Sequence, residues 1–186
     1  MATRLEVFEN AIRETNASVT VATPETIDEI LSKVITLPAV GAPLPFDDVS
    51  LERVSPSIDT RPTRIQLLEA ETGVTGATLG IASYGSVVLR ATGDVDELAA
   101  LFPERHVVLV RECDVVDDMV TAFDELAPIV ESDGADVIVA TGPSATADMG
   151  ALVHGVHGPT EVHVVIVATD DGGIEEDATD DPEGRH

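Results

Sequence analysis

Residues 140–167 read ATGPSATADMGALVHGVHGPTEVHVVIV, and they are the part of the chain that most clearly indicates its fold. It follows a β-branched run, residues 137–140, that stops at a Thr-Gly-Pro turn unable to continue a central strand. Ser144 then stands at an expected helix N-cap, where the following amides lack intrahelical partners and can hold a carboxylate or phosphate. A second glycine turn, residues 155–159, leads into an aliphatic strand at residues 161–168. These are the parts of an α/β ligand pocket, which open α/β sheets place at strand ends.

The rest of the chain alternates between helical and extended patterns. The patterns predict helices over residues 2–15, 24–35, 63–71, 96–101 and 115–129, and strands over residues 18–22, 86–91 and 107–110. The last of these strands is four consecutive aliphatic residues, which is typical of a strand buried on both faces. This alternation predicts a three-layer α/β/α domain with a mainly parallel sheet.

Three segments interrupt this alternation. Ser83-Tyr84-Gly85 stands between two extended runs and predicts a hairpin or tight turn. Residues 38–62 hold five of the eleven prolines and are expected to form loop and edge structure. Residues 170–186 are acidic and lack periodicity, which predicts a disordered tail after one domain at residues 1–169.

The charge is strongly one-sided. The chain has 35 acidic and 10 basic residues, a formal net charge of −25 at pH 7. A field of this sign repels nucleic acid and anionic lipid, so a nucleic-acid partner is not expected. The hydrophobic content is 44%, an ordinary value for a folded domain, so the acidity belongs to a folded surface. In dilute solution the acidic groups of such a surface would repel one another. Molar salt screens exposed charges to within about 3 Å and so removes this repulsion, and we therefore expect a protein from a halophile.

Cysteine usage and hydropathy limit the classes further. Cys113 is the sole cysteine, so the chain cannot form an internal disulfide or hold an iron–sulfur cluster through cysteines. We expect Cys113 to be a small core or edge residue and not a reactive thiol. The N-terminus has no signal-peptide core and no apolar run reaches the length of a membrane span, which indicates a soluble, cytoplasmic protein.

Common catalytic and metal motifs are missing from the sequence. The glycines form neither G-x-G-x-x-G nor a P-loop, so a nucleotide cofactor is not indicated. No G-x-S-x-G elbow is present, and Ser144 has no assignable base. The spacing of His154, His157 and His163 fixes no common face, so no metal site is expected. His157, between two glycine turns, remains a candidate for a ligand hydrogen bond or an acid–base role.

Several short motifs follow one another in a fixed order within residues 64–168. They are Gly73-Val74-Thr75-Gly76-Ala77, Ile81-Ala82 with Gly85-Ser86, Gly142-Pro143-Ser144 with Thr146-Ala147-Asp148, and Gly155-Val156-His157-Gly158-Pro159 before Val162-His163-Val164. In this order they resemble the LUD domain family, and within it the lactate-utilisation protein C group. The resemblance implies a fold similar to the NagB/RpiA/CoA-transferase group. It also implies a place in a system that oxidises L-lactate to pyruvate with iron–sulfur partner proteins.

The resemblance also implies a ligand pocket built from the turns of these motifs. The candidate ligand-binding residues are Thr75, Gly76, Gly85, Ser86, Gly142, Ser144, Thr146, Asp148, His157 and Gly158. The family usually has Glu-Thr where this chain has Ser83-Tyr84, which removes the carboxylate that fold relatives would use as a nucleophile. It usually has Arg where this chain has Ala145, which removes a bidentate carboxylate binder. No catalytic residue is therefore assigned.

Three hypotheses about function follow from the sequence. The first is a LUD-domain subunit that contributes binding or assembly to L-lactate oxidation, with no cofactor of its own and with the iron–sulfur clusters on its partners. The second is an independent enzyme or binder of a phosphorylated sugar or an acyl-CoA, with the anion held at the Ser144 turn, by analogy of fold. The third is a non-catalytic scaffold. The sequence leaves the oligomeric state open, a homo-oligomer included.

The halophilic assignment predicts a salt-dependent stability. We expect the thermal unfolding midpoint to rise when dilute buffer is replaced by molar KCl, because screening weakens the repulsion among surface carboxylates. Circular dichroism melts in the two solvents measure the shift. A midpoint in dilute buffer equal to or above that in KCl would contradict the assignment.

Overall fold

The computed structural model describes residues 2–47, 49–54, 57–91, 94–133, 136–144 and 158–169. The helices are α1 (Arg4–Glu14), α2 (Ile27–Val34), α3 (Arg64–Glu69), α4 (Asp94–Leu101) and α5 (Met119–Asp133). The strands are β1 (Ser18–Ala22), β2 (Ala39–Gly41), β3 (Thr72–Gly76), β4 (Leu79–Ile81), β5 (Ser86–Ala91), β6 (Arg105–Arg111), β7 (Val115–Val116), β8 (Asp136–Ala140) and β9 (Glu161–Val167). Three short 3-10 turns are η1 (Leu51–Arg53), η2 (Ala82–Tyr84) and η3 (Glu112–Asp114). The predicted tail, residues 170–186, lies outside the described residues.

Most elements lie close to where the sequence patterns predict them, and two helix starts differ by more than two residues. The second helix begins at Ile27 and not at residue 24, because the Thr26 hydroxyl accepts the Thr23 N–H at 2.9 Å and holds residues 23–26 in a turn. The helix expected from residue 115 begins at Met119, since Val115–Val116 pair with β4 as a strand. Both errors concern boundaries where hydrogen bonds outside the helix decide the start.

A five-stranded parallel sheet forms the centre of the molecule, in the order β1-β9-β6-β3-β2. Its middle strand, β6, is buried over residues 107–110. Val107 and Leu109 pack with α2 and with segment 42–58, whereas Val108 and Val110 pack with α1, α4 and β5. The prediction of a mainly parallel sheet covered on both faces is confirmed.

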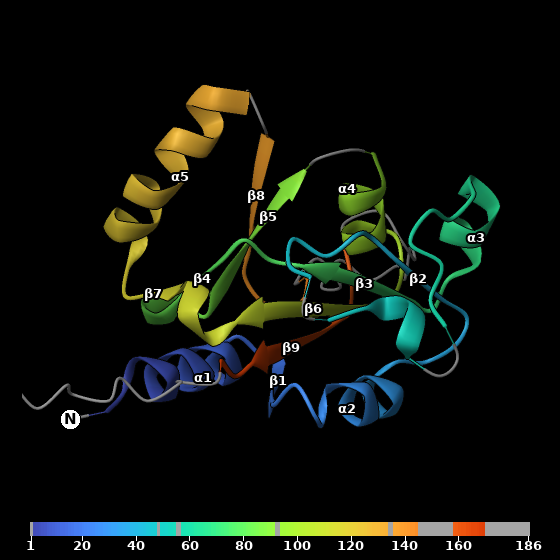
Figure 1. Ribbon diagram of the computed structural model, residues 1–186, viewed down its shortest axis with the longest axis horizontal. Coiled ribbons are helices and arrows are strands. Elements are labelled where there is room, and N and C mark those ends of the chain that lie inside the picture. Colours follow the sequence, from blue (N-terminus) through green and yellow to red (C-terminus); the bar gives the residue numbers. More distant parts are fainter. Residues whose placement is uncertain are drawn as a thin grey trace, which may run out of the picture.

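A second sheet, in the order β7-β4-β5-β8, lies beside the first (Figure 1). Its hairpin β4–β5 turns through Ala82–Gly85, which confirms the turn predicted there. Helix α5 covers its outer face, where Ala122 and Leu126 pack against Ile81 and Val88. The sequence did not indicate that β7 and β8 pair with this hairpin, because strand pairing between distant segments leaves no local pattern.

The strand that precedes the quoted stretch belongs to this second sheet. Strand β8 pairs antiparallel with β5, with Val87 opposite Ala140 and Ala91 opposite Asp136. The sequence predicted a strand here, and the structure places it in the second sheet and not in the parallel one. It is the end strand of that sheet in the described residues, and none of its residues is fully buried.

Two glycines of the quoted motifs serve close packing. A Cβ on Gly73 would lie 1.7 Å from the Ala99 carbonyl oxygen, so that β3 and α4 touch backbone to backbone. Gly85 has φ +61°, and its Cβ would lie 2.5 Å from the Ala11 carbonyl carbon of α1. Glycine is required at both positions by space, and at Gly85 also by conformation.

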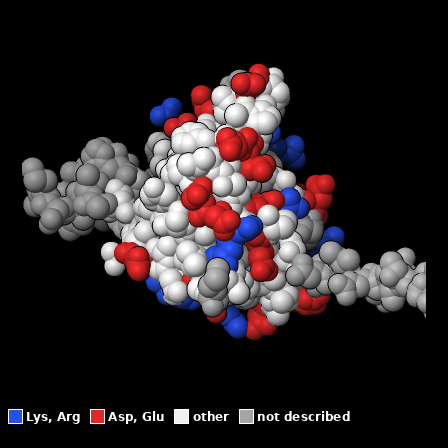
Figure 2. All heavy atoms as spheres, turned by 90° about the vertical axis from the view of Figure 1, so that its left-hand side faces the viewer, with Lys and Arg blue, Asp and Glu red and all other residues white. Residues whose placement is uncertain are grey.

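The acidic surface is visible on the side that carries α1 and α5. Figure 2 shows acidic side chains spread over this face, with basic side chains among them at the centre and along the rim. None of the helices in the described ranges is long and apolar enough to cross a membrane.

Phe8 fixes α1 to the sheets, and its truncation should be costly. The ring is fully buried, and its Cζ lies 2.8 Å from where a Cβ of Gly80 would stand. We expect Phe8→Ala to lower the free energy of unfolding by about 3–5 kcal/mol through lost burial and the cavity it leaves. Urea unfolding measures this loss. The neighbouring Val7→Ala, at a side chain 40% exposed, is the control and should cost less than about 1 kcal/mol; equal losses would show that Phe8 does not anchor α1.

Candidate functional site

A cavity of about 220 Å³ lies where the end of β8 crosses the start of β6 and β9. Its walls come from the end of α4, the middle of β5, residues 138–144 and residues 158–162. They are mainly aliphatic, with Leu89, Ala100 and Ile138 among them. The polar side chains in the wall are those of His106, Thr141 and Ser144. A small apolar cavity with a few convergent polar groups is the usual form of a ligand site.

His106 is the buried polar group of this cavity. It is the second residue of β6, its side chain is only 3% exposed, and its Nε2 lies 2.7 Å from the Thr75 hydroxyl on β3. Burial lowers the pKa of the imidazole from 6.5 to about 4. The ring is therefore neutral at pH 7, with one nitrogen that donates and one that accepts. Which of them faces Thr75 depends on the tautomer.

Two turns that are distant in sequence form the mouth of the cavity. The Ser144 N–H donates to the Pro159 carbonyl oxygen at 2.8 Å, which ties residues 141–144 to the start of β9. Gly158 has φ +103°, and a Cβ there would meet the Ser144 Cβ at 3.7 Å. The Thr141 hydroxyl lies 2.7 Å from the Ser86 hydroxyl, so the same turn is also tied to β5.

The structure brings together a part of the predicted site. Ser144, Gly142 and Gly158 line the cavity directly. Ser86 adjoins it through Thr141, and Thr75 adjoins it through His106. The Gly-Pro-Ser turn and Gly158-Pro159, the described end of the second glycine turn, thus lie beside one cavity, and ligand binding there stays a prediction.

Two predicted residues lie elsewhere. Gly76 is at the end of β3, where a Cβ would lie 2.2 Å from Pro45 Cδ on the other face of the sheet. Gly85 packs against α1, and Ser83 beside it donates its N–H to the Asp117 carbonyl at 3.0 Å. Their local sequences are glycine-containing motifs like those at the cavity. The positions of Gly76 and Gly85 away from the cavity follow from the path of the chain and not from these motifs.

Three further predicted residues, Thr146, Asp148 and His157, lie outside the described residues, as does the helix expected after Ser144. The edge of the sheet also differs from the expectation. The cavity lies at the amino ends of the parallel strands β6 and β9, because β8 belongs to the second sheet and its carboxyl end reaches that edge. Open α/β sheets bind ligands at the carboxyl ends of their parallel strands. This rule does not apply to β8, because β8 is not a strand of the parallel sheet.

His106 was missed by the sequence analysis. The available signal was a lone imidazole in an otherwise aliphatic strand, RHVVLVR at residues 105–111. A buried titratable side chain requires a hydrogen-bond partner. For His106 this partner is the Thr75 hydroxyl on the neighbouring strand.

The other imidazole and thiol groups lie apart from the cavity. His163 contacts the Thr20 hydroxyl at 3.1 Å, and it alternates along β9 with the residues that face the cavity. Cys113 is exposed and not in the core; partial desolvation and the Asp114 carboxylate raise its pKa, so the thiolate is disfavoured at neutral pH. Among the described residues, no three His, Cys, Asp or Glu side chains gather in a way that could hold a metal ion.

The cavity therefore offers neutral polar groups within apolar walls. Its described wall holds no Lys or Arg. The nearest cation in β6, Arg105, hydrogen-bonds to Glu161 and to the Val34 carbonyl, so its charge is already compensated. Such a site can bind a small organic molecule through an imidazole and hydroxyl groups, and a neutral imidazole can accept a proton.

Comparison with known proteins identifies similar chains. The model of the LUD domain family matches residues 5–167. Lactate utilization protein C of Deinococcus radiodurans is 27% identical over 173 residues, which cover 88% of this chain and 79% of that protein. The protein of the same name from Bacillus subtilis is 30% identical over 105 residues, 54% of this chain and 43% of that one. A crystal structure of a DUF162 family protein from Deinococcus radiodurans has a TM-score of 0.62 at 22% identity, covers 90% of this chain and 99% of that one, and thus shares the fold.

The lowered pKa of His106 predicts a pH-dependent stability. Between pH 6.5 and about 4 the unfolded chain binds a proton that the buried imidazole does not. The free energy of unfolding therefore falls as the pH falls through this window, by up to about 3 kcal/mol from this residue. His106→Gln removes the titration and keeps an amide near Thr75, so this variant should lose less stability between pH 7 and pH 4.

Urea unfolding of wild type and His106→Gln at several pH values measures how the free energy of unfolding of each changes with pH. The contribution of the carboxylates is the same in both proteins and cancels in the comparison. His163→Gln is the control, and it should change the profile less because its imidazole is only half-buried. If wild type and His106→Gln lose stability in parallel, the His106 pKa is not lowered as stated.

Proposed function

The chain belongs to the LUD domain family, and from this we propose that it is a component of an L-lactate utilization system, acting beside iron–sulfur partner proteins. The observation that carries the proposal is the match of the family over residues 5–167, joined to relatives that are named lactate utilization protein C. The match includes both cavity turns and the β3 and β6 strands beneath them.

The proposal divides the work between this chain and its partners. Oxidation of L-lactate to pyruvate releases two electrons and two protons, so it requires an electron acceptor. This chain has one cysteine and cannot hold a cluster through cysteine ligands, so the acceptor clusters belong on the partners. The contribution of this chain is a binding site or a contact that assembles the system.

The cavity beside His106 supports a binding role. At about 220 Å³ it suits a molecule of a few carbons, with aliphatic walls for a methyl group. The imidazole of His106 and the hydroxyls of Thr141 and Ser144 suit a hydroxyl or a carboxylate. The described wall lacks the cations that a sugar phosphate or a CoA phosphate would favour, so those ligands draw no support from it.

Deletion of the gene should abolish or severely slow growth on L-lactate and leave growth on pyruvate unchanged, because only the oxidation step is removed. Growth curves of the deletion strain on each carbon source measure this, and the wild-type gene on a plasmid should restore growth. Unchanged growth on L-lactate would contradict the proposed function.

Complementation with His106→Gln and Ser144→Ala tests the cavity separately. If the cavity binds a participant in the pathway, both variants should restore growth less well than wild type at equal protein levels. Full restoration of growth by both variants would show that the cavity is not needed for growth on L-lactate. It would not contradict the role of the protein in lactate utilization.

A further inference from the structure

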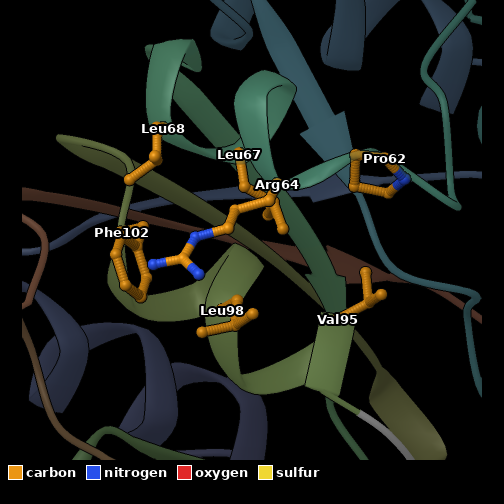
Figure 3. Close-up of a pocket in the computed structure, with 7 residues that line it drawn as sticks. All are labelled: Pro62, Arg64, Leu67, Leu68, Val95, Leu98 and Phe102. Carbon is orange, nitrogen blue, oxygen red and sulfur yellow. The ribbon is translucent and has the colours of Figure 1, made fainter.

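A second cavity lies between α3 and α4, apart from the His106 site. It has a volume of about 410 Å³ and is lined by six apolar side chains and one cation, Arg64 (Figure 3). Leu67 and Leu68 come from α3, whereas Leu98 and Phe102 come from α4 and the residue that follows it. The volume falls in the range of small-molecule sites. No residue is shared with the His106 cavity.

Arg64 is chemically unusual in this protein. Within the described ranges its guanidinium makes no hydrogen bond or ion pair, although the chain carries 35 acidic residues. Most of the other described cations, by contrast, form ion pairs with carboxylates; these are Arg4, Arg13, Lys33, Arg105 and Arg111. Figure 3 shows the Arg64 side chain extended across the cavity with its guanidinium toward Phe102.

The stability of α3 does not account for this arginine. Arg64 is the first residue of the helix, where the helix dipole disfavours a positive charge. The start of the helix is already capped by Thr63, which exchanges hydrogen bonds with Gln66. A neutral or acidic residue would serve the helix better at this position.

The apolar walls of the cavity are open to solvent. Leu68 is 59% exposed and Phe102 is 43% exposed. Large apolar side chains that gather at one place on a surface commonly mark a contact site. A ligand for this place therefore needs an apolar part for the walls and an anionic group for Arg64.

We propose that this cavity binds an amphipathic monocarboxylate, with the carboxylate on the Arg64 guanidinium and the hydrocarbon chain along Leu67, Leu98 and Phe102. The guanidinium fork matches a carboxylate in a bidentate geometry. A monoanion is favoured over a phosphate dianion because a single cation must hold it inside the field of a strongly acidic protein. This site is independent of the proposed role in lactate utilization.

Isothermal titration calorimetry with decanoate, at concentrations below micelle formation, tests the proposal on the full chain. Two probes dissect the ligand: decanol keeps the chain without the charge, and propionate keeps the charge without the chain. Three variants dissect the site. Arg64→Gln removes the cation, Leu68→Asn makes an exposed wall polar, and Arg53→Gln is the matched control, because Arg53 is also an exposed arginine without a described ion pair but lies outside the cavity.

We expect decanoate to bind with one-to-one stoichiometry, and decanol and propionate to bind at least roughly tenfold more weakly. Arg64→Gln should weaken decanoate by roughly tenfold or more, Leu68→Asn should weaken it to a smaller degree, and Arg53→Gln should leave it unchanged. Thermal unfolding midpoints equal to that of wild type confirm that the variants are folded. Absent binding, equal affinities of decanoate and decanol, or equal losses in Arg64→Gln and Arg53→Gln would overturn the proposal. Arg64 would then only cover the apolar walls with its aliphatic stem.

Discussion

Strand β6 is buried on both faces. The elements that cover each face must therefore present apolar side chains to it. Val107 and Leu109 need α2 and segment 42–58 on one side, whereas Val108 and Val110 need α1, α4 and β5 on the other. Parallel strands β3 and β9 satisfy its backbone at both edges. The proline-rich segment thus has a structural role, because Phe46, Leu51 and Ile58 complete the core under the sheet.

The same burial gives the His106 cavity its chemistry. The imidazole in this strand is buried, so it stays neutral at neutral pH and forms its hydrogen bond with Thr75 on the adjacent strand. The second sheet then brings the turn at residues 141–144 over the amino ends of β6 and β9. The cavity is therefore a product of two sheets, and neither sheet forms it alone.

Charge distinguishes the two cavities. The described wall around His106 carries no cation, so it binds through neutral donors and acceptors. The cavity between α3 and α4 has apolar walls around one guanidinium. In a chain with net charge −25, most described cations are matched by a carboxylate, and the exposed arginine of α3 differs because apolar side chains surround it. The two sites are thus expected to select different small molecules.

Most helices and strands, and the α/β class, follow from local sequence patterns. Four consecutive aliphatic residues at 107–110 predicted a buried strand, residues 161–168 predicted a second strand, and the structure pairs the two in parallel. The predicted pocket residues Ser144 and Gly158 lie beside one cavity. Three features required the folded chain: β8 joins a second sheet, Gly76 and Gly85 pack away from the cavity, and His106 and Thr75 lie beneath it. The two sets of features differ in the sequence separation of the residues that determine them. Periodicity and turn chemistry are set by neighbours a few residues apart, whereas strand pairing depends on hydrogen bonds and packing between segments tens of residues apart.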